Sequence, residues 1–292
     1  MATCLFVAIE ITAGLRSHSL SLLADAGHNA TDALALLLAA VAVWFQGKPA
    51  DHVKTFGYQR AGVLAAFINA LTLIVLSGWI FWEAWQRLRN PEPVSAGVMI
   101  GVAAIGILLN GGIMLGLNRA RHSDLNIRAA FVHMLGDLLG SAAIVVGGAA
   151  MYFTNVLQID TVLSVAIAAL IVYTAWDVTK ESLNILLEGL PRGLHLAQVE
   201  TALGQVEGVL DVHDLHIWSL GSNSRALSCH LVIEDLPPSE SDCILRRVNA
   251  LLDHDFQIGH TTVQFEHVGC VVSREGCVIA VGPAQGHTHH HH

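Results

Sequence analysis

The chain has 292 residues, of which 53% are hydrophobic and only 13% are charged. Ordinary soluble domains carry roughly 25% charged residues, so this composition indicates a membrane protein with a smaller soluble part. The formal net charge of −9 and the pI near 6.0 argue against a nucleic-acid partner. Five cysteines, of which only Cys4 lies in the apolar part, do not make a disulfide framework and fit a reducing compartment.

Six apolar runs follow one another in the first part of the chain, at about residues 2–16, 20–45, 58–87, 94–118, 127–153 and 159–186. A membrane-spanning helix needs about 20 residues, so we expect six transmembrane helices. The first run is short, which leaves open whether the chain begins at its natural N-terminus. It has no basic leader or small-residue cleavage site, so we do not interpret it as a cleavable signal peptide.

The basic residues of the loops predict how these helices are oriented. Lys48, Lys54 and Arg60 lie between the second and third runs, and Arg119, Arg121 and Arg128 lie between the fourth and fifth. Basic residues are in excess on the cytoplasmic side of membrane proteins. Arg87 and Arg89 on the other side weaken this bias without reversing it. We therefore expect both loops and the soluble tail in the cytoplasm, with the helices in the cell inner membrane.

Two histidine–aspartate pairs lie inside apolar runs, His28 with Asp32 and His133 with Asp137. Each pair is spaced by four residues, so on a helix both side chains share one face. A charge at the bilayer centre costs about 2.5–3.5 kcal/mol, and such residues usually mark a pathway or a site. One pair alone could be a packing element or a proton relay. Two pairs of the same spacing favour a four-ligand zinc site between the second and fifth helices.

The charges of these four residues suit an exchange of metal for protons. Zn²⁺ carries +2 and two aspartates carry −2, so the loaded site is formally neutral when both histidines are neutral. Protons and metal compete for the same atoms. We expect Asp25, two turns before Asp32, to line the pathway without binding metal. Three further acidic residues are interpreted as structural or as helix-end residues, namely Glu10, Asp160 and Asp177.

The soluble tail has the pattern of a small two-layer α+β domain of order αββαβ. Helical spacing covers residues 194–206 and 240–254, and strand patterns cover 209–220, 226–233 and 261–268. A turn at residues 221–224 separates the first two strands. We expect the helices to cover one face of the sheet.

Several motifs together resemble those of cation diffusion facilitators. Residues 23–32 (LADAGHNATD) and 131–137 (FVHMLGD) are similar to the paired signature of that family. Residues 49–51 with 56–58, residues 212–220 (VHDLHIWSL) and residues 260–266 (HTTVQFE) match it as well. The resemblance covers nearly the whole chain and is strongest to the zinc-exporting subgroup.

This resemblance implies a homodimeric metal/proton antiporter of six transmembrane helices with a metallochaperone-like cytoplasmic domain. It implies a transmembrane transport domain over 1–188, a cytoplasmic metal-binding and dimerisation domain over 189–277, and a tail over 278–292. The His-rich tail is either native or part of a purification tag. By the same resemblance, the candidate metal ligands of the cytoplasmic domain are His213, His230, His260 and Glu266. Cys270 follows them closely and is a further candidate, because a thiolate suits zinc. Their grouping stays open, and His216 is expected on the opposite face of its strand.

A second site in the loop after the second helix is not expected, because Lys54 and Tyr58 stand where some family members have histidines. Two imidazoles favour zinc over harder ions such as Mn²⁺, Mg²⁺ and Ca²⁺, and cobalt is the nearest competitor. Two alternatives to zinc export stay open: a transporter mainly for cobalt or another divalent metal, and a membrane metal sensor or scaffold that does not transport. A membrane metalloprotease is not expected, since the sequence has no His-Glu-x-x-His motif.

Overall fold

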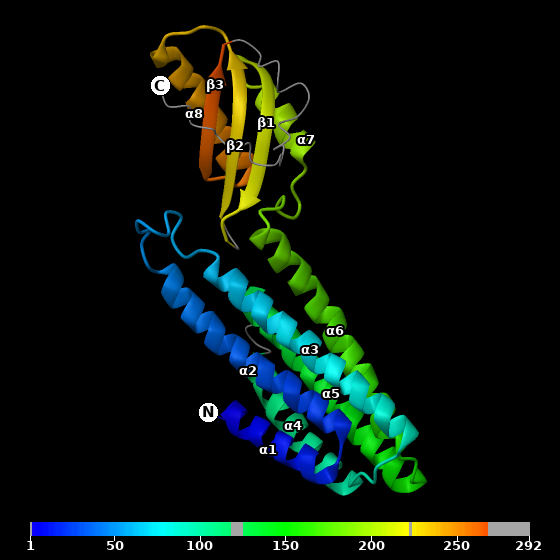
Figure 1. Cartoon of the computed structure of the whole chain (residues 1–292). Coiled ribbons are helices and arrows are strands. Elements are labelled where there is room, and N and C mark those ends of the chain that lie inside the picture. The colour runs from blue at the N-terminus through cyan, green and yellow to red at the C-terminus, as the bar shows by residue number, and fades with distance from the viewer. Residues whose placement is uncertain (1, 118–124, 222–223, 268–292) are drawn as a thin grey trace, which may run out of the picture. The chain divides into compact units, whose positions relative to one another are not determined.

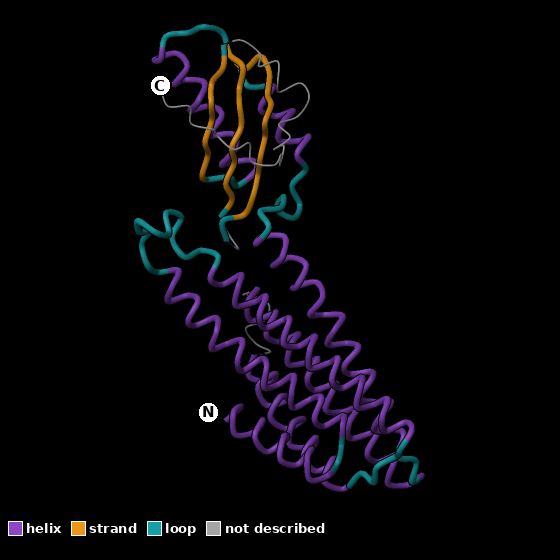
Figure 2. Tube along the Cα trace, viewed as in Figure 1, coloured by secondary structure: helices purple, strands orange, loops and turns teal. Residues whose placement is uncertain are grey.

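The computed structural model describes residues 2–117, 125–221 and 224–267. Contacts divide the chain into two units, Met1–Leu183 and Asn184–His292. The first unit is a bundle of helices, and the second combines helices with a small sheet (Figures 1 and 2).

The predicted apolar runs are all helices in the structure. These are α1 (Ala2–Ser17), α2 (Leu20–Gln46), α3 (Ala61–Arg89), α4 (Ala96–Leu117), α5 (Leu125–Thr154) and α6 (Gln158–Leu186). Within the described residues, the five helices α2–α6 are long and apolar enough to cross a membrane. Helix α1 has 16 residues, about 24 Å at 1.5 Å per residue, against about 30 Å of hydrocarbon. A sixth membrane span therefore stays a prediction.

A buried carboxylate joins the start of α2 to α6. Asp160, in the first turn of α6, accepts hydrogen bonds from the hydroxyls of Ser19 and Ser21 at 2.8 and 2.6 Å. It also accepts one from the backbone N–H of Leu20 at 2.7 Å. Ser19 in turn caps α2 by accepting from the N–H of Leu22. The structural role expected for Asp160 agrees with these contacts.

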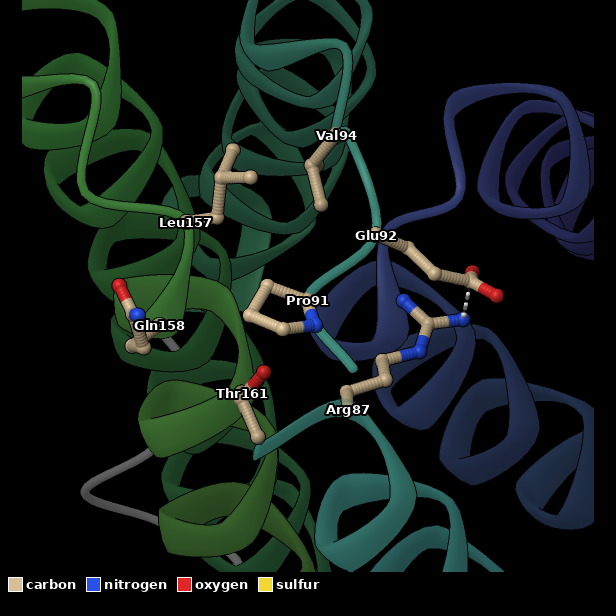
Figure 3. Close-up of a pocket in the computed structure, with 7 residues that line it drawn as sticks. All are labelled: Arg87, Pro91, Glu92, Val94, Leu157, Gln158 and Thr161. Carbon is tan, nitrogen blue, oxygen red and sulfur yellow. Dashed lines mark ion pairs between the residues drawn. The ribbon is translucent and has the colours of Figure 1, made fainter. Parts of the chain in front are cut away.

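Arg87, near the end of α3, strengthens the same end of the bundle. Its guanidinium donates to Glu83 at 3.1 Å and lies 3.6 Å from the carboxylate of Glu92. Figure 3 shows this pair beside the link between α3 and α4, in a small pocket that is also lined by Leu157, just before α6, and by Thr161 of α6. Arg87 Nη1 also lies 4.0 Å from Asp160 Oδ2, so polar contacts connect α3 to the junction of α2 and α6.

Small residues allow the helices of the first unit to approach closely. A Cβ at Gly27 of α2 would clash with the end of the Leu76 side chain of α3, so a larger residue there would require Leu76 to move. Ala24, Ala84 and Ala168 are buried where α2, α3 and α6 meet. Many large apolar side chains on the outside are exposed, as a lipid-facing surface requires.

The second unit confirms the predicted order αββαβ. It contains α7 (Leu196–Gly204), β1 (Val209–Ser219), β2 (Arg225–Ile233), α8 (Pro238–Phe256) and β3 (His260–Glu266). The sheet has the order β1-β2-β3, with β2 antiparallel to β1 and parallel to β3. Figure 2 shows both helices behind the sheet, and the core between them includes Leu203, Leu231 and Val248.

Candidate metal sites

The two predicted histidine–aspartate pairs meet inside the helical unit. One ligand atom from each of His28, Asp32, His133 and Asp137 lies within 4.8 Å of the other three. His28 Nε2 is 3.6 Å from Asp32 Oδ2 and 3.5 Å from Asp137 Oδ1. His133 Nε2 is 3.1 Å from Asp32 Oδ2 and 3.7 Å from Asp137 Oδ2. The structure therefore brings together all four residues predicted for this site.

These distances have the scale of a tetrahedral metal shell. Zinc lies about 2.0–2.1 Å from imidazole nitrogen and carboxylate oxygen, so two ligand atoms of a tetrahedron are about 3.3 Å apart. The four nitrogen–oxygen separations, 3.1 to 3.7 Å, bracket this value. Asp32 Oδ2 is buried, and the Nε2 atoms of both histidines lie near it. The donor set fits a four-coordinate divalent ion.

The site is buried unevenly. Asp137 has a side-chain exposure of 7%, whereas His133 has 44%. The His133 imidazole is thus accessible, whereas the Asp137 carboxylate is in a poorly solvated position. A carboxylate in such a position is stabilised by a paired cation.

The helices that carry the ligands belong to different helix pairs. Helix α2 packs along α1 and α3, and α5 packs along α4, whereas α2 and α5 make few contacts with each other. The ligands on α2 and α5 can therefore separate without breaking the main contacts of either helix. Such an arrangement is compatible with a site whose shell opens and closes as helices shift.

The loop between α2 and α3 is held by its own hydrogen bonds. Asp51 Oδ1 accepts from the backbone N–H groups of Lys54 and Val53, and the hydroxyl of Tyr58 donates to Asp51 Oδ2 at 3.0 Å. These bonds hold the pKa of the exposed Asp51 carboxyl below its usual value, those from the backbone most strongly. The oxygens of Asp51 are thus engaged in hydrogen bonds within the loop.

The second unit brings together a smaller group, His213, His230 and Glu266. His213 Nε2 is 3.1 Å from Glu266 Oε2, and His230 Nδ1 is 3.1 Å from Glu266 Oε1. The register explains this group, because His213 of β1 lies opposite His230 of β2, and Val232 of β2 lies opposite Glu266 of β3. His213 Nδ1 is buried, and none of the described residues satisfies it. Three ligands fit a divalent metal whose shell is completed by a further group.

The structure does not bring His260 into this group. His260 begins β3 opposite Ala226, six residues from Glu266 and therefore about 20 Å away along the strand. His260 therefore does not belong to this group of three, and its role as a metal ligand stays a prediction. Cys270, the fifth predicted ligand, lies outside the described residues. Burial raises the pKa of Cys229 to about 12, so this cysteine is a protonated thiol in the core.

One residue at this cluster was missed. Asp214 Oδ2 lies 3.6 Å from His230 Nε2, and Asp214 Oδ1 lies 3.0 Å from His216 Nε2. The strand register shifts between His213 and His216, and Asp214 has a φ of 51°. This bulge gives Asp214 contacts to both histidines, which a regular two-residue alternation does not predict. His216 pairs with Asp214 and does not belong to the group of three.

Comparisons with known proteins agree with this geometry. The model of the cation efflux transmembrane domain matches residues 1–187, and the model of the cation efflux protein cytoplasmic domain matches residues 191–268. The C-terminal domain of the CzcD transporter, solved with bound metal, is 37% identical over 25% of this chain and 99% of that domain. Its TM-score is 0.23, so only the sequence likeness is informative.

Curated relatives extend over nearly the full length. The zinc transporter ZitB of Shigella flexneri is 38% identical over 98% of this chain and 90% of its own length. A cadmium, cobalt and zinc/H(+)-K(+) antiporter of Bacillus subtilis is 38% identical over 89% of this chain and 85% of its own. The metal cation efflux protein CzcD of Cupriavidus metallidurans is 36% identical over 91% and 84%. These matches confirm the resemblance drawn from the motifs, and the chain belongs to the cation efflux family of membrane transporters.

Proposed function

We propose that this protein exports Zn²⁺ from the cytoplasm in exchange for protons, and that His28, Asp32, His133 and Asp137 bind the transported ion. The observation that carries the proposal is the convergence of these four side chains between two apolar helices, with nitrogen–oxygen separations of 3.1 to 3.7 Å. Zinc accepts such a compact shell of nitrogen and oxygen ligands readily. The names of the relatives, zinc transporters and metal/proton antiporters, support the same activity.

The exchange follows from the chemistry of the ligands. A bound Zn²⁺ neutralises the two aspartates, which lowers the cost of holding the ion away from water. When the ion leaves, protons can occupy the same oxygen and nitrogen atoms. Transport then requires that the site open to one side at a time, for which the sparse packing between α2 and α5 leaves room.

A second candidate substrate is Co²⁺ or another divalent ion of similar size. The Bacillus relative carries cadmium and cobalt in its name beside zinc. Ligand type alone distinguishes these ions weakly, because all of them accept imidazole and carboxylate. We rank zinc first because it accepts four-coordinate shells of imidazole and carboxylate ligands readily, and because the ZitB relatives are named for zinc. A metal sensor or scaffold that does not transport remains the alternative of a different class.

We further propose a homodimer in the inner membrane with the C-terminal unit in the cytoplasm. The basic residues Lys48, Lys54 and Arg60 between α2 and α3 support this orientation. The proposed boundaries are 1–188 for the transport domain, 189–277 for the metal-binding and dimerisation domain, and 278–292 for the tail. In the cytoplasmic domain, His213, His230 and Glu266 would hold a resident Zn²⁺, which would link the three strands and stabilise the folded unit.

The deciding experiment is metal uptake into proteoliposomes with an imposed pH gradient. Zinc should accumulate when the gradient drives protons out of the vesicle, and reversing the gradient should slow or reverse the flux. The vesicle lumen should become more alkaline as zinc enters. Zinc flux that does not depend on the pH gradient would contradict exchange for protons. Zinc binding without any flux would favour the alternative of a metal sensor. Parallel assays with Co²⁺ and Cd²⁺ rank the candidate substrates.

A further inference from the structure

Two carboxyl groups outside the metal shell are buried side by side in the helical unit. Glu10 of α1 has an exposure of 0% and Asp25 of α2 has 4%. The two side chains lie within hydrogen-bonding reach of each other. The amide of Asn29 donates to Glu10 Oε2 at 2.9 Å, and the hydroxyl of Ser141 on α5 lies within reach of Asp25. The pair therefore connects α1, α2 and α5.

Each carboxyl keeps one oxygen without a donor. Glu10 Oε1 and Asp25 Oδ2 are buried, and neither has a partner among the described residues. An ionised carboxylate only accepts hydrogen bonds, so two ionised groups facing each other would leave both oxygens unsatisfied and would repel. One proton on the pair changes this, because the resulting O–H donates to the facing carboxylate. A charged pair without that proton would carry a large desolvation cost.

Two titratable groups of the metal site act electrostatically on the pair, His28 of α2 and Asp137 of α5. A protonated His28 would favour the ionised form of Asp25, whereas the charge of Asp137 has the same sign as that of the pair. In the described part of the chain, no lysine or arginine forms an ion pair with either carboxyl. Asp25 lies about one turn before His28, and Ser141 about one turn after Asp137. The pair is therefore adjacent to the metal site without being part of its shell.

We propose that Glu10 and Asp25 share one proton in the metal-free protein and release it when a divalent ion binds at the neighbouring site. The inference rests on the proposed proton exchange and names a carrier separate from the metal ligands. The O–H bond of the shared carboxyl breaks, the proton leaves as H⁺ to water, and the positive charge of the bound ion stabilises the two carboxylates that remain. No oxidant, reductant or other reactant is needed.

Infrared difference spectra of the full-length protein in nanodiscs test the shared proton directly. Comparing metal-free with zinc-loaded wild-type protein should show loss of the C=O stretching band of a protonated carboxyl group. Glu10→Gln and Asp25→Asn should each remove this band from the difference spectrum. Glu83→Gln is the matched control, since Glu83 is a carboxylate of α3 already paired with Arg87, and it should leave the band unchanged. A wild-type spectrum without such a band would overturn the proposal even if neither variant folds.

Counting protons tests the release. In weakly buffered solution, Glu10→Gln and Asp25→Asn should each release about one proton fewer per bound Zn²⁺ than wild type and Glu83→Gln. Each amide can still donate a hydrogen bond across the pair, so zinc binding should persist in both variants. Equal proton counts in wild type and in both variants would refute this carrier. That outcome is distinct from failure of the proposed function, in which wild-type protein would take up zinc without any proton movement in proteoliposomes.

Discussion

The shortest contact in the membrane site joins two helices: His133 Nε2 of α5 lies 3.1 Å from Asp32 Oδ2 of α2. The other contact between the helices, from His28 to Asp137, is 3.5 Å. Both are shorter than the distances within each helix, 3.6 Å for His28 to Asp32 and 3.7 Å for His133 to Asp137. Each histidine thus faces the aspartate of the opposite helix most closely. The geometry of the shell therefore depends on the distance between α2 and α5. A conformational change between open and closed states would alter this distance.

Removing one ligand should abolish transport without unfolding the protein. Asp137→Asn and His133→Ala each leave an incomplete shell, and Asp137→Asn also leaves the loaded site with an uncompensated positive charge. Loss of a residue that only supports a ligand costs about 10–100-fold in metal affinity, so loss of a ligand should cost more. Zinc uptake into proteoliposomes measures the effect, with size-exclusion profiles to check folding. His52→Ala, an exposed histidine of the loop, is the control and should transport normally. Near-normal uptake by either ligand variant would show that the four residues do not act together.

Most of the fold could be predicted from the sequence because its patterns are local. Apolar runs of 20 or more residues gave the helices to within a few positions, and alternation gave the three strands. The ligand pairs of the membrane site could be found for the same reason, since residues four apart on a helix share a face. The contacts of Asp160 with Ser19 and Ser21 could not be found, because they join residues far apart in the chain.

The cytoplasmic site was predicted only in part, and the reason is strand register. His213 and His230 are paired across β1 and β2, and Glu266 of β3 is paired with Val232, two residues from His230, so it is a diagonal neighbour of that histidine. His260 matches the same family motif as Glu266, but it begins the strand that Glu266 ends. Asp214 was missed because a bulge with positive φ breaks the alternation on which strand predictions rest. Register and bulges depend on pairing between strands, which one sequence does not display.

Residue 28 should influence the choice of metal. In His28→Asp the shell would hold three carboxylates, which can bind through one or two oxygens and so suit larger ions. We expect the preference for zinc over cadmium and manganese to fall, and competition by protons at low pH to rise with the added negative charge. Parallel uptake of the three metals at several pH values measures both effects, with His52→Asp as the matched control. If the active variant keeps the wild-type order of metals, residue 28 does not set selectivity.

The hydrogen bonds by which Asp160 joins the start of α2 to α6 should contribute to the stability of the protein. Asp160→Asn removes the charge that accepts hydrogen bonds from residues 19–21, and one amide cannot accept at both former oxygens. Hydrogen bonds to a buried charged group contribute about 1.5–3 kcal/mol, so we expect a loss of about 2 kcal/mol in unfolding free energy. Thermal unfolding in detergent measures this loss. Glu92→Gln, in which a more exposed partner of Arg87 is changed, should cost less than about 1 kcal/mol. Equal costs for the two variants would argue against a special role of Asp160.

Metal bound in the cytoplasmic unit should stabilise that unit. At a zinc concentration of about 100 times Kd, one site adds about 2.7 kcal/mol to the unfolding free energy. Glu266→Gln should remove most of this gain, because Glu266 contacts both His213 and His230. Unfolding of the full-length protein carrying Asp137→Asn, with and without zinc, isolates this site from the membrane site. The same zinc-induced rise in Glu266→Gln would place the stabilising metal elsewhere.

The backbone conformation at Asp214 should matter more for zinc affinity than for the stability of the metal-free protein. Its φ of 51° lies in the left-handed region, where a residue with a Cβ is less favourable than glycine. Asp214→Gly relieves this strain but adds chain entropy to the unfolded state, so metal-free stability should change by less than about 1 kcal/mol. Zinc affinity should fall by about tenfold, because the carboxylate that lies 3.6 Å from His230 Nε2 and helps to orient that ring is lost.

Asp214→Asn distinguishes the effect of the lost charge from the effect of the changed backbone. It keeps the shape of the side chain and should lose a similar part of the zinc affinity. Zinc titrations of both variants, again in the Asp137→Asn background, give the affinities, with Asp235→Asn as an exposed control. If both variants keep the wild-type affinity for zinc, Asp214 does not contribute to the metal site.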